Sequence, residues 1–186
     1  MGRDKVIKIT RNWVETFVVG FNLCPFAKKE LVTGALHLSV SEATSEEGLL
    51  ADLQSELKLL VEDNNKTTTL LIHPNVLQDF YDYNQFLDVA DALLVDMELE
   101  GIYQIASFHP DYQFSDTQID DAENYTNKSP YPMLHLLPES LVEKAIEAYP
   151  NIDGIPERNT VLLASMGSKA LHLKRSECLD KDMPPN

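Results

Sequence analysis

The chain has 186 residues, 44% of them hydrophobic, which is the size of one domain with a core of its own. Thirty acidic against fifteen basic residues give a net charge of -15, which argues against binding to nucleic-acid phosphates or to an anionic membrane surface. No run approaches the ~20 apolar residues of a membrane-spanning helix, and no secretory signal begins the chain, so a cytoplasmic protein is predicted. Two cysteines, Cys24 and Cys178, are too few for a disulfide framework.

The spacing of apolar and turn residues predicts helices that alternate with short strands. In chain order these are helices over 6–19 and 25–33, a strand over 36–40, a helix that Thr44 and Glu47 cap, a strand over 67–72, a helix over 76–97, strands over 102–108 and 133–137, and helices that open at Pro138 and at Pro156.

This order predicts an α/β (or α+β) fold, with helices packed on a small mixed sheet of about four strands. Residues 1–175 are expected to form a single globular domain, and 176–186 a frayed C-terminal tail that contains Cys178. A ferredoxin-like and a doubly wound topology both fit this order of elements.

Two predicted strands end in a His-Pro pair, His73-Pro74 and His109-Pro110. Because open α/β sheets bind ligands at the carboxyl ends of their strands, parallel strands would bring both histidines to one edge. The alternative is that each histidine only hydrogen-bonds backbone where its strand stops. His135 is expected to face away from Leu134 and Leu136, either toward solvent or into a polar pocket. His109 and His135 are the acid/base candidates.

Cys24 is the candidate nucleophile. If Pro25 is the first residue of a helix, Cys24 is its N-cap, where unpaired amides and the helix dipole favour a thiolate. A nearby histidine would complete an activated pair. The alternative is a small buried hydrophobic side chain in a tight turn.

A long polar and aromatic segment, 107–139, joins the last two predicted strands. Long irregular connections in compact domains are often functional. The side chains of this segment could hold a small polar or anionic ligand, or could instead hydrogen-bond the segment to itself. The ligand-binding candidates are His73, Tyr112, Asn127, Lys128, Ser129 and Tyr131, with Arg158 and Asn159 from the last helix as a possible anion clamp.

A metal site is a weaker interpretation of the same residues. His73, His109 and His135 with Asp111 or Asp116 have suitable ligand types, but no two are spaced as a local chelating motif. No metal ligand is therefore assigned, and any cofactor stays unknown. Phosphate-binding loops, dinucleotide-binding turns and nucleophile elbows are absent from the sequence.

Five segments together carry a family resemblance: FNLCPFA (21–27), LLIHPNVLQDFYDYNQFLDVAD (70–91), GIYQIASFHPDYQF (101–114), NYTNKSPYPMLHLLPESLVEKA (124–145) and IPERN (155–159). The chain resembles the uncharacterised bacterial family labelled domain of unknown function 1415, from about Trp13 to Gly167. The resemblance implies a single-domain soluble protein without an agreed activity, and it supplies no catalytic residues.

Three functions follow as hypotheses. The favoured one is a small-molecule enzyme or ligand binder with a polar His/Asn/Ser/Tyr pocket at the strand ends; whether it catalyses a reaction is left open. The alternative is a non-catalytic accessory or partner-binding protein, with an exposed aromatic patch of Tyr112, Phe114, Tyr125 and Tyr131. A metal-dependent hydrolase is the further alternative. The oligomeric state is left open.

Overall fold

The computed structural model describes residues 2–62, 68–149 and 154–179. Its elements in chain order are α1 (Arg3–Trp13), η1 (Val14–Val19), α2 (Ala27–Thr33), β1 (Leu36–Val40), α3 (Glu46–Glu62), β2 (Thr68–Ile72), α4 (Phe80–Asp96), β3 (Tyr103–Phe108), η2 (Ala122–Thr126), β4 (Met133–Pro138), α5 (Glu139–Ala148), α6 (Gly154–Met166) and α7 (Ser168–Leu179).

The four strands form one mixed sheet in the order β1-β2-β4-β3. β1 and β2 are parallel, whereas β4 lies between β2 and β3 and is antiparallel to both. β2 and β3 therefore run in the same direction, and their carboxyl ends lie at the same edge of the sheet. The predicted fold class, helices on a small mixed sheet of about four strands, is confirmed.

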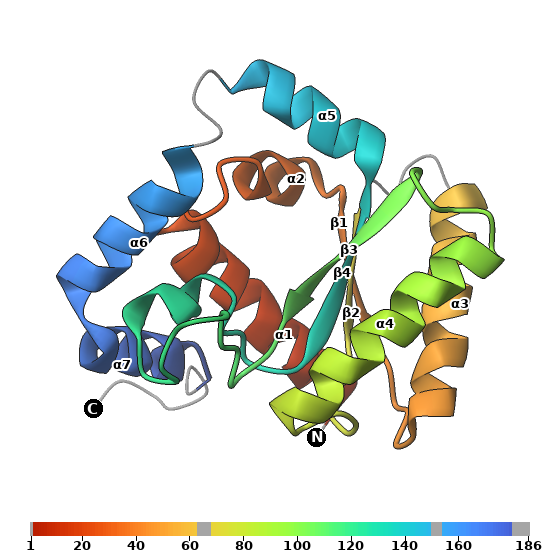
Figure 1. The fold of residues 1–186 in the computed structure, drawn as a ribbon, viewed down its shortest axis with the longest axis horizontal. Coiled ribbons are helices and arrows are strands. Elements are labelled where there is room, and N and C mark those ends of the chain that lie inside the picture. Colours follow the sequence, from red (N-terminus) through yellow and green to blue (C-terminus); the bar gives the residue numbers. More distant parts are fainter. Residues whose placement is uncertain (1, 63–67, 150–153, 180–186) are drawn as a thin grey trace.

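Helices cover both faces of the sheet (Figure 1). α3 and α4 lie on one face, and α1, α2, α5, α6 and α7 lie on the other. Strand residues alternate between the two layers, as the pleat requires: Leu71, Leu134 and Leu136 pack toward α3 and α4, and Leu70, Ile72 and Met133 pack toward α1. Each face thus has its own apolar core, with the sheet between them.

Helix starts differ from the predictions by a few residues. Asp79 is the N-cap of α4 and accepts hydrogen bonds from the amides of Tyr81 and Asp82, so the helix begins at Phe80 rather than at 76. The Ser45 hydroxyl, and not that of Thr44, accepts from the Gly48 amide at the start of α3. In α2 the N-cap is Phe26, so the expected N-cap position of Cys24 is wrong.

The C-terminal end also differs from the expectation. α7 continues to Leu179, and Cys178 is buried, with its sulfur 3.3 Å from the Thr16 hydroxyl. Residues 176–179 therefore belong to the helical layer over α1 instead of a frayed tail, and residues 180–186 lie outside the described part of the chain.

None of the helices in the described part of the chain combines the length and apolar character that crossing a bilayer needs.

Candidate functional site

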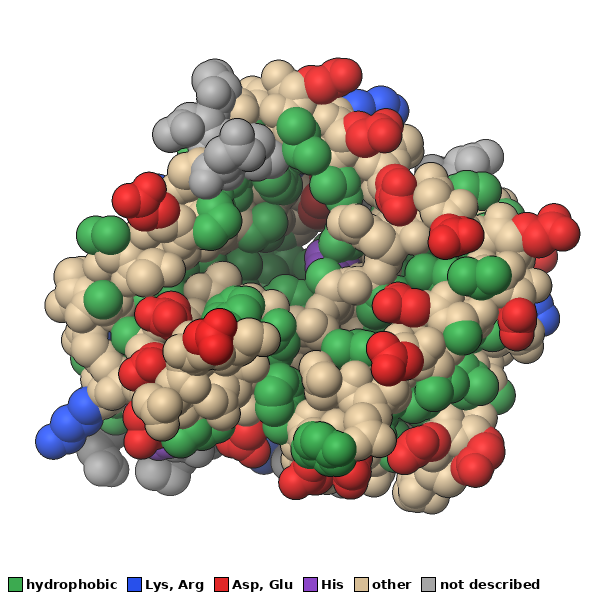
Figure 2. All heavy atoms as spheres, in the orientation of Figure 1, with side chains coloured by type: hydrophobic (Ala, Val, Ile, Leu, Met, Phe, Trp, Pro, Cys, Tyr) green, Lys and Arg blue, Asp and Glu red, His purple; other side chains and the backbone are tan. Residues whose placement is uncertain are grey.

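A cavity of about 290 Å³ lies between the sheet and the helices on its α1 face. Figure 2 shows this hollow, lined mostly by hydrophobic side chains and with a histidine visible inside it. Its walls come from Trp13 and the following π-helix, from the turn before α2, from all four strands and from α5. This cavity therefore lies over a face of the sheet, whereas the sequence predicted a pocket at the strand ends.

The helix α5 forms one wall and has no buried residue of its own. Its apolar residues Leu141, Val142 and Ala145 line the cavity. An amphipathic helix normally buries its apolar stripe against a protein core. In α5 this stripe faces the hollow instead.

His135 is the histidine that lines the cavity, and a short relay of hydrogen bonds fixes its ring. The Thr68 hydroxyl lies 2.8 Å from the carbonyl oxygen of Leu136 and 2.6 Å from Nε2 of His135. Since a hydroxyl has one proton and a carbonyl has none, Thr68 donates to Leu136. Nε2 of His135 must then carry the proton that Thr68 accepts. Nδ1 has no hydrogen-bond partner among the described residues.

Burial lowers the pKa of His135 to about 4. Its ring is therefore neutral near pH 7, and Nδ1 carries a lone pair rather than a proton. The strand position of His135 explains this environment: the ring lies opposite Leu70 on β2 and Ala106 on β3. The expectation that it faces away from Leu134 and Leu136 is confirmed, and the pocket on that side is mainly apolar.

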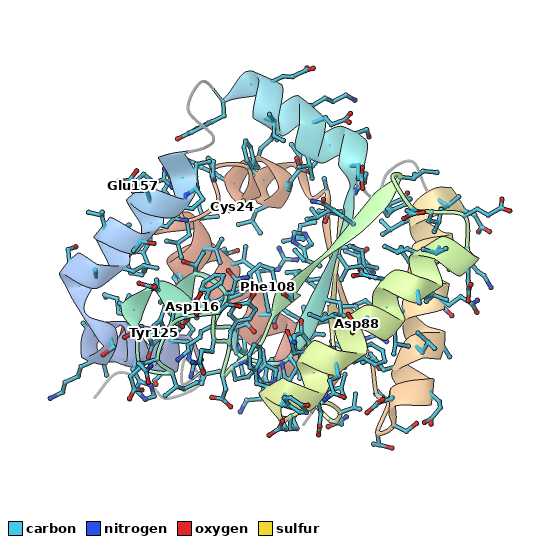
Figure 3. The ribbon with its side chains drawn as sticks, viewed as in Figure 1. Cys24, Asp88, Phe108, Asp116, Tyr125 and Glu157 are labelled. Carbon is cyan, nitrogen blue, oxygen red and sulfur yellow. The ribbon has the colours of Figure 1, made fainter. Side chains whose placement is uncertain are left out.

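Cys24 lines the same cavity from the turn before α2 and is half-buried. Figure 3 labels Cys24 beside α2 and Phe108, another lining residue, on the sheet. Two of the three predicted catalytic residues, Cys24 and His135, therefore lie around one cavity.

Arg158 and Asn159 hold this turn from α6. Asn159 is buried, and its side-chain amide donates to the Leu23 carbonyl at 2.8 Å. The Arg158 guanidinium donates to the Asn22 carbonyl and to Oδ1 of Asn159. Their polar groups are thus hydrogen-bonded to the turn that carries Cys24, which is a different arrangement from the predicted anion clamp.

His73 and His109 lie at one edge of the sheet, as parallel strands require. Both are fully buried and both pack against the ring of Tyr83, with centroid distances of 5.8 and 5.1 Å. His109 accepts from the Asp111 amide through Nδ1 and donates through Nε2 to Leu77. Burial lowers the pKa of His109, and it lowers the pKa of His73 to about 4.

The segment between β3 and β4 is bonded mainly to itself. Asn127 donates to the Ser107 carbonyl, Lys128 to Ile119 and Ser129 to Tyr131. The ammonium of Lys128 also lies 4.9 Å from the centre of the Tyr125 ring. Burial is the main cause that lowers the pKa of Lys128, and Arg175 adds to it. These candidates therefore stabilise the loop, and none of them lines the cavity.

The four rings expected as an exposed patch are not exposed. Tyr125 is buried, and the other three are half-buried. Tyr112 packs between Phe80 and Phe114, at centroid distances of 5.2 and 5.0 Å.

No group of three or more His, Cys, Asp or Glu side chains within the described residues has the arrangement of a metal site. The interpretation that joined His73, His109 and His135 with Asp111 or Asp116 therefore has no geometric support there.

Several cavity residues were missed by the sequence reasoning, chiefly Trp13, Thr68 and the apolar side of α5. The amphipathic pattern of 139–148 is a local signal for the α5 residues, but by itself it indicates only a helix that packs its apolar side against the protein. The bond between Thr68 and His135 depends on the pairing of two strands that are 67 residues apart, and no local pattern indicates it.

No curated protein and no solved structure matches the chain. A family model does match it, over residues 5–173, which is most of its length. The chain therefore belongs to the family described as protein of unknown function (DUF1415).

Proposed function

We propose that this protein binds a small, mainly apolar molecule in the cavity between the sheet and α5. The single observation that carries the proposal is the cavity itself, about 290 Å³ of space with largely apolar walls and a few polar groups. This volume is near the lower end of the roughly 300–1,000 Å³ typical of small-molecule sites, which also combine apolar walls with a few polar groups.

The packing of the rest of the molecule supports a ligand there. Protein interiors are close-packed, with few voids larger than a water molecule. Leu49, Leu53 and Leu57 on the opposite face are fully buried, whereas Leu141, Val142 and Ala145 of α5 line the cavity and are only half-buried. A bound apolar molecule would give these side chains a packing partner, and burial of apolar surface is worth about 25 cal/mol per Å².

Binding is favoured over thiol catalysis by the chemistry of His135. A general base works best when its pKa lies near the working pH. With a pKa of about 4, His135 is a weak base for the Cys24 thiol. Cys24 also lies outside the N-cap position that would favour its thiolate, because the N-cap of α2 is Phe26.

The fluorescence of Trp13 tests the proposal, because it is the only tryptophan of the chain and lines the cavity. Titration with 1-octanol, an apolar probe small enough for the site, should change the Trp13 emission in a saturable way. Ala145→Phe, which fills the cavity, should abolish the change. Val95→Phe, at an exposed position on α4, is the matched control and should leave it intact.

Alkylation of Cys24 gives a second readout. Octanol should slow the reaction of Cys24 with iodoacetamide, followed by peptide mass spectrometry, since the thiol shares the cavity with the probe. The proposal would be overturned if octanol changed the Trp13 emission equally in the Ala145→Phe variant and left the rate of Cys24 alkylation unchanged.

A further inference from the structure

The polar groups around the cavity limit which apolar molecule can bind there. Glu30 contributes an acidic side chain to the lining, and the described residues that line the cavity include no lysine or arginine. A ligand that carries a carboxylate or phosphate would therefore lose its hydration without gaining a cationic partner, which is costly in an apolar site.

His135 is the polar group best placed to select a ligand. Its Nε2–H donates to the Thr68 hydroxyl, which in turn donates to the Leu136 carbonyl, at the distances given above. Thr68 is itself buried, so this relay is shielded from competing water. This hydrogen bond to Thr68 fixes the orientation and the tautomer of the ring. The lone pair on Nδ1 is then the hydrogen-bonding group that the ring can offer to a ligand.

We infer that the natural ligand is an uncharged apolar molecule bearing a hydroxyl or N–H group, which donates a hydrogen bond to Nδ1 of His135. This inference rests on the proposed function, because it names the ligand class of the same cavity. His135 is the specificity-determining residue, and Thr68 is a positioning residue that acts through it.

Three probes of equal length separate the possibilities: 1-octanol, 1-methoxyheptane and octanoate at pH 7.5. Octanol can donate to Nδ1, the ether cannot, and octanoate is charged. A neutral hydrogen bond contributes about 0.5–1.5 kcal/mol net, so octanol should bind roughly 2- to 10-fold more tightly than the ether by calorimetry and Trp13 emission. Octanoate should bind at least about tenfold more weakly than octanol.

Variants then test whether the preference for octanol over the ether depends on His135 and on its hydrogen bond to Thr68. His135→Phe should bring the affinities for octanol and the ether together. Thr68→Val, which keeps the shape of the side chain but removes its hydroxyl, should reduce the preference for octanol, and Thr68→Ser should restore it. Nitrogen-15 NMR of the histidine rings adds a readout of the tautomer: in the unliganded protein His135 should carry its proton on Nε2, and the Thr68→Val change should disturb that signal.

The possible results distinguish the two proposals. Equal affinity for octanol and the ether in the unaltered protein, with the Trp13 response still abolished by Ala145→Phe, would overturn the ligand class and leave the binding function standing. A proton on Nδ1 of His135 would overturn it in the same way. Absence of any saturable response to the three probes would overturn the binding function, and with it the inference that rests on it.

Discussion

Tyr83 uses its hydroxyl to join three elements in the interior. The hydroxyl donates to the Met133 carbonyl of β4 at 2.9 Å and accepts from the Phe108 amide of β3 at 3.0 Å, while the residue itself belongs to α4. The ring is fully buried, and burial raises the pKa of Tyr83 above its ordinary value. Buried polar groups of this kind are costly to leave without partners.

We expect Tyr83→Phe to lower the free energy of unfolding by about 1–3 kcal/mol, because it leaves the Phe108 amide without that acceptor. Urea denaturation followed by circular dichroism measures the change. Tyr81→Phe is the matched control: Tyr81 is 71% exposed on the same helix, so its loss of a hydroxyl should be close to neutral. Equal effects of the two changes would contradict the role given to the Tyr83 hydroxyl.

Asn159 is the second residue that connects distant segments. Replacing it with alanine removes the bond to the Leu23 carbonyl and should cost about 1–3 kcal/mol in the same assay. The turn that carries Cys24 should also loosen, so iodoacetamide should react faster with that thiol. Glu157→Ala, at an exposed position in the same helix, should change neither quantity. An unchanged alkylation rate in the Asn159 variant would mean that this bond does not hold the turn.

Individual side chains were predictable where one local rule governs them. Strand alternation gave the correct orientation of His135, and the two His-Pro pairs gave the correct strand ends. For the helix expected from Val76, the apolar spacing predicts a buried side of Leu77, Phe80, Leu87, Ala90, Leu94 and Met97. Ala90 and Leu94 are buried as predicted, whereas Tyr83 and Phe86 are buried without having been predicted. Asp79 sets the true start, and the buried side is centred on Tyr83, Phe86 and Ala90.

At the scale of elements, α5 is buried far less than α3. Four leucines of α3 are buried in the core, whereas α5 has no buried residue and the exposed Ile146. Local opening of a helix requires little free energy where few apolar contacts hold it. α5 should therefore open more readily than α3.

Hydrogen exchange measured by mass spectrometry tests this expectation. The amides of α5 should exchange well before those of α3, and saturation with 1-octanol should slow exchange in α5 while leaving α3 unchanged. α3 serves as the internal reference in the same sample. Protection of α5 equal to that of α3 without any ligand would show that the helix is held by the protein alone.

Elements were predictable where a regular apolar pattern defines them. β1 was predicted at its observed bounds, and Gly34, with φ of 71°, ends α2 as expected. α7 was missed because only Leu171 and Cys178 are buried along it, which leaves no regular stripe in the sequence. Its position over α1 depends on tertiary contacts, among them the bond from Asn12 to the Cys178 carbonyl.

At the scale of the whole molecule, the cavity could not be predicted from local patterns. Its walls come from residues between Trp13 and Ala145, and they meet because β4 inserts between β2 and β3 in the sheet. The sequence placed the site in the 107–139 segment, whose polarity proved to serve its own hydrogen bonds. Strand order is a non-local property, and so is every contact that depends on it.

The buried histidines make the stability of the fold depend on pH. Burial lowers the pKa of His73 to about 4, from an ordinary value near 6.5, and the neighbouring His109 adds to the effect. Nδ1 of His73 donates to Val76, and its buried Nε2 has no partner among the described residues. A proton on that ring would therefore be buried without compensation, beside Tyr83 and His109.

The unfolded chain takes up this proton as the pH falls below about 6.5, whereas the folded chain resists it down to about pH 4. Protons thus bind preferentially to the unfolded state in this window, and stability must fall on acidification. For His73 alone the loss between pH 7.5 and pH 5 should be about 2 kcal/mol. His135, with a pKa lowered to about 4, and His109, whose pKa is also lowered, act in the same direction.

Urea denaturation at pH 7.5, 6.5, 5.8 and 5.0 measures this dependence, with the His73→Asn change as the decisive comparison. Asparagine keeps a donor near Val76 but does not titrate, so the free energy of unfolding should vary less with pH than in the unaltered chain. His172→Asn removes an exposed histidine on α7 and should leave the dependence as it was. If the two variants lose stability equally between pH 7.5 and 5.0, the acid sensitivity does not come from His73, even though that ring is buried against Tyr83.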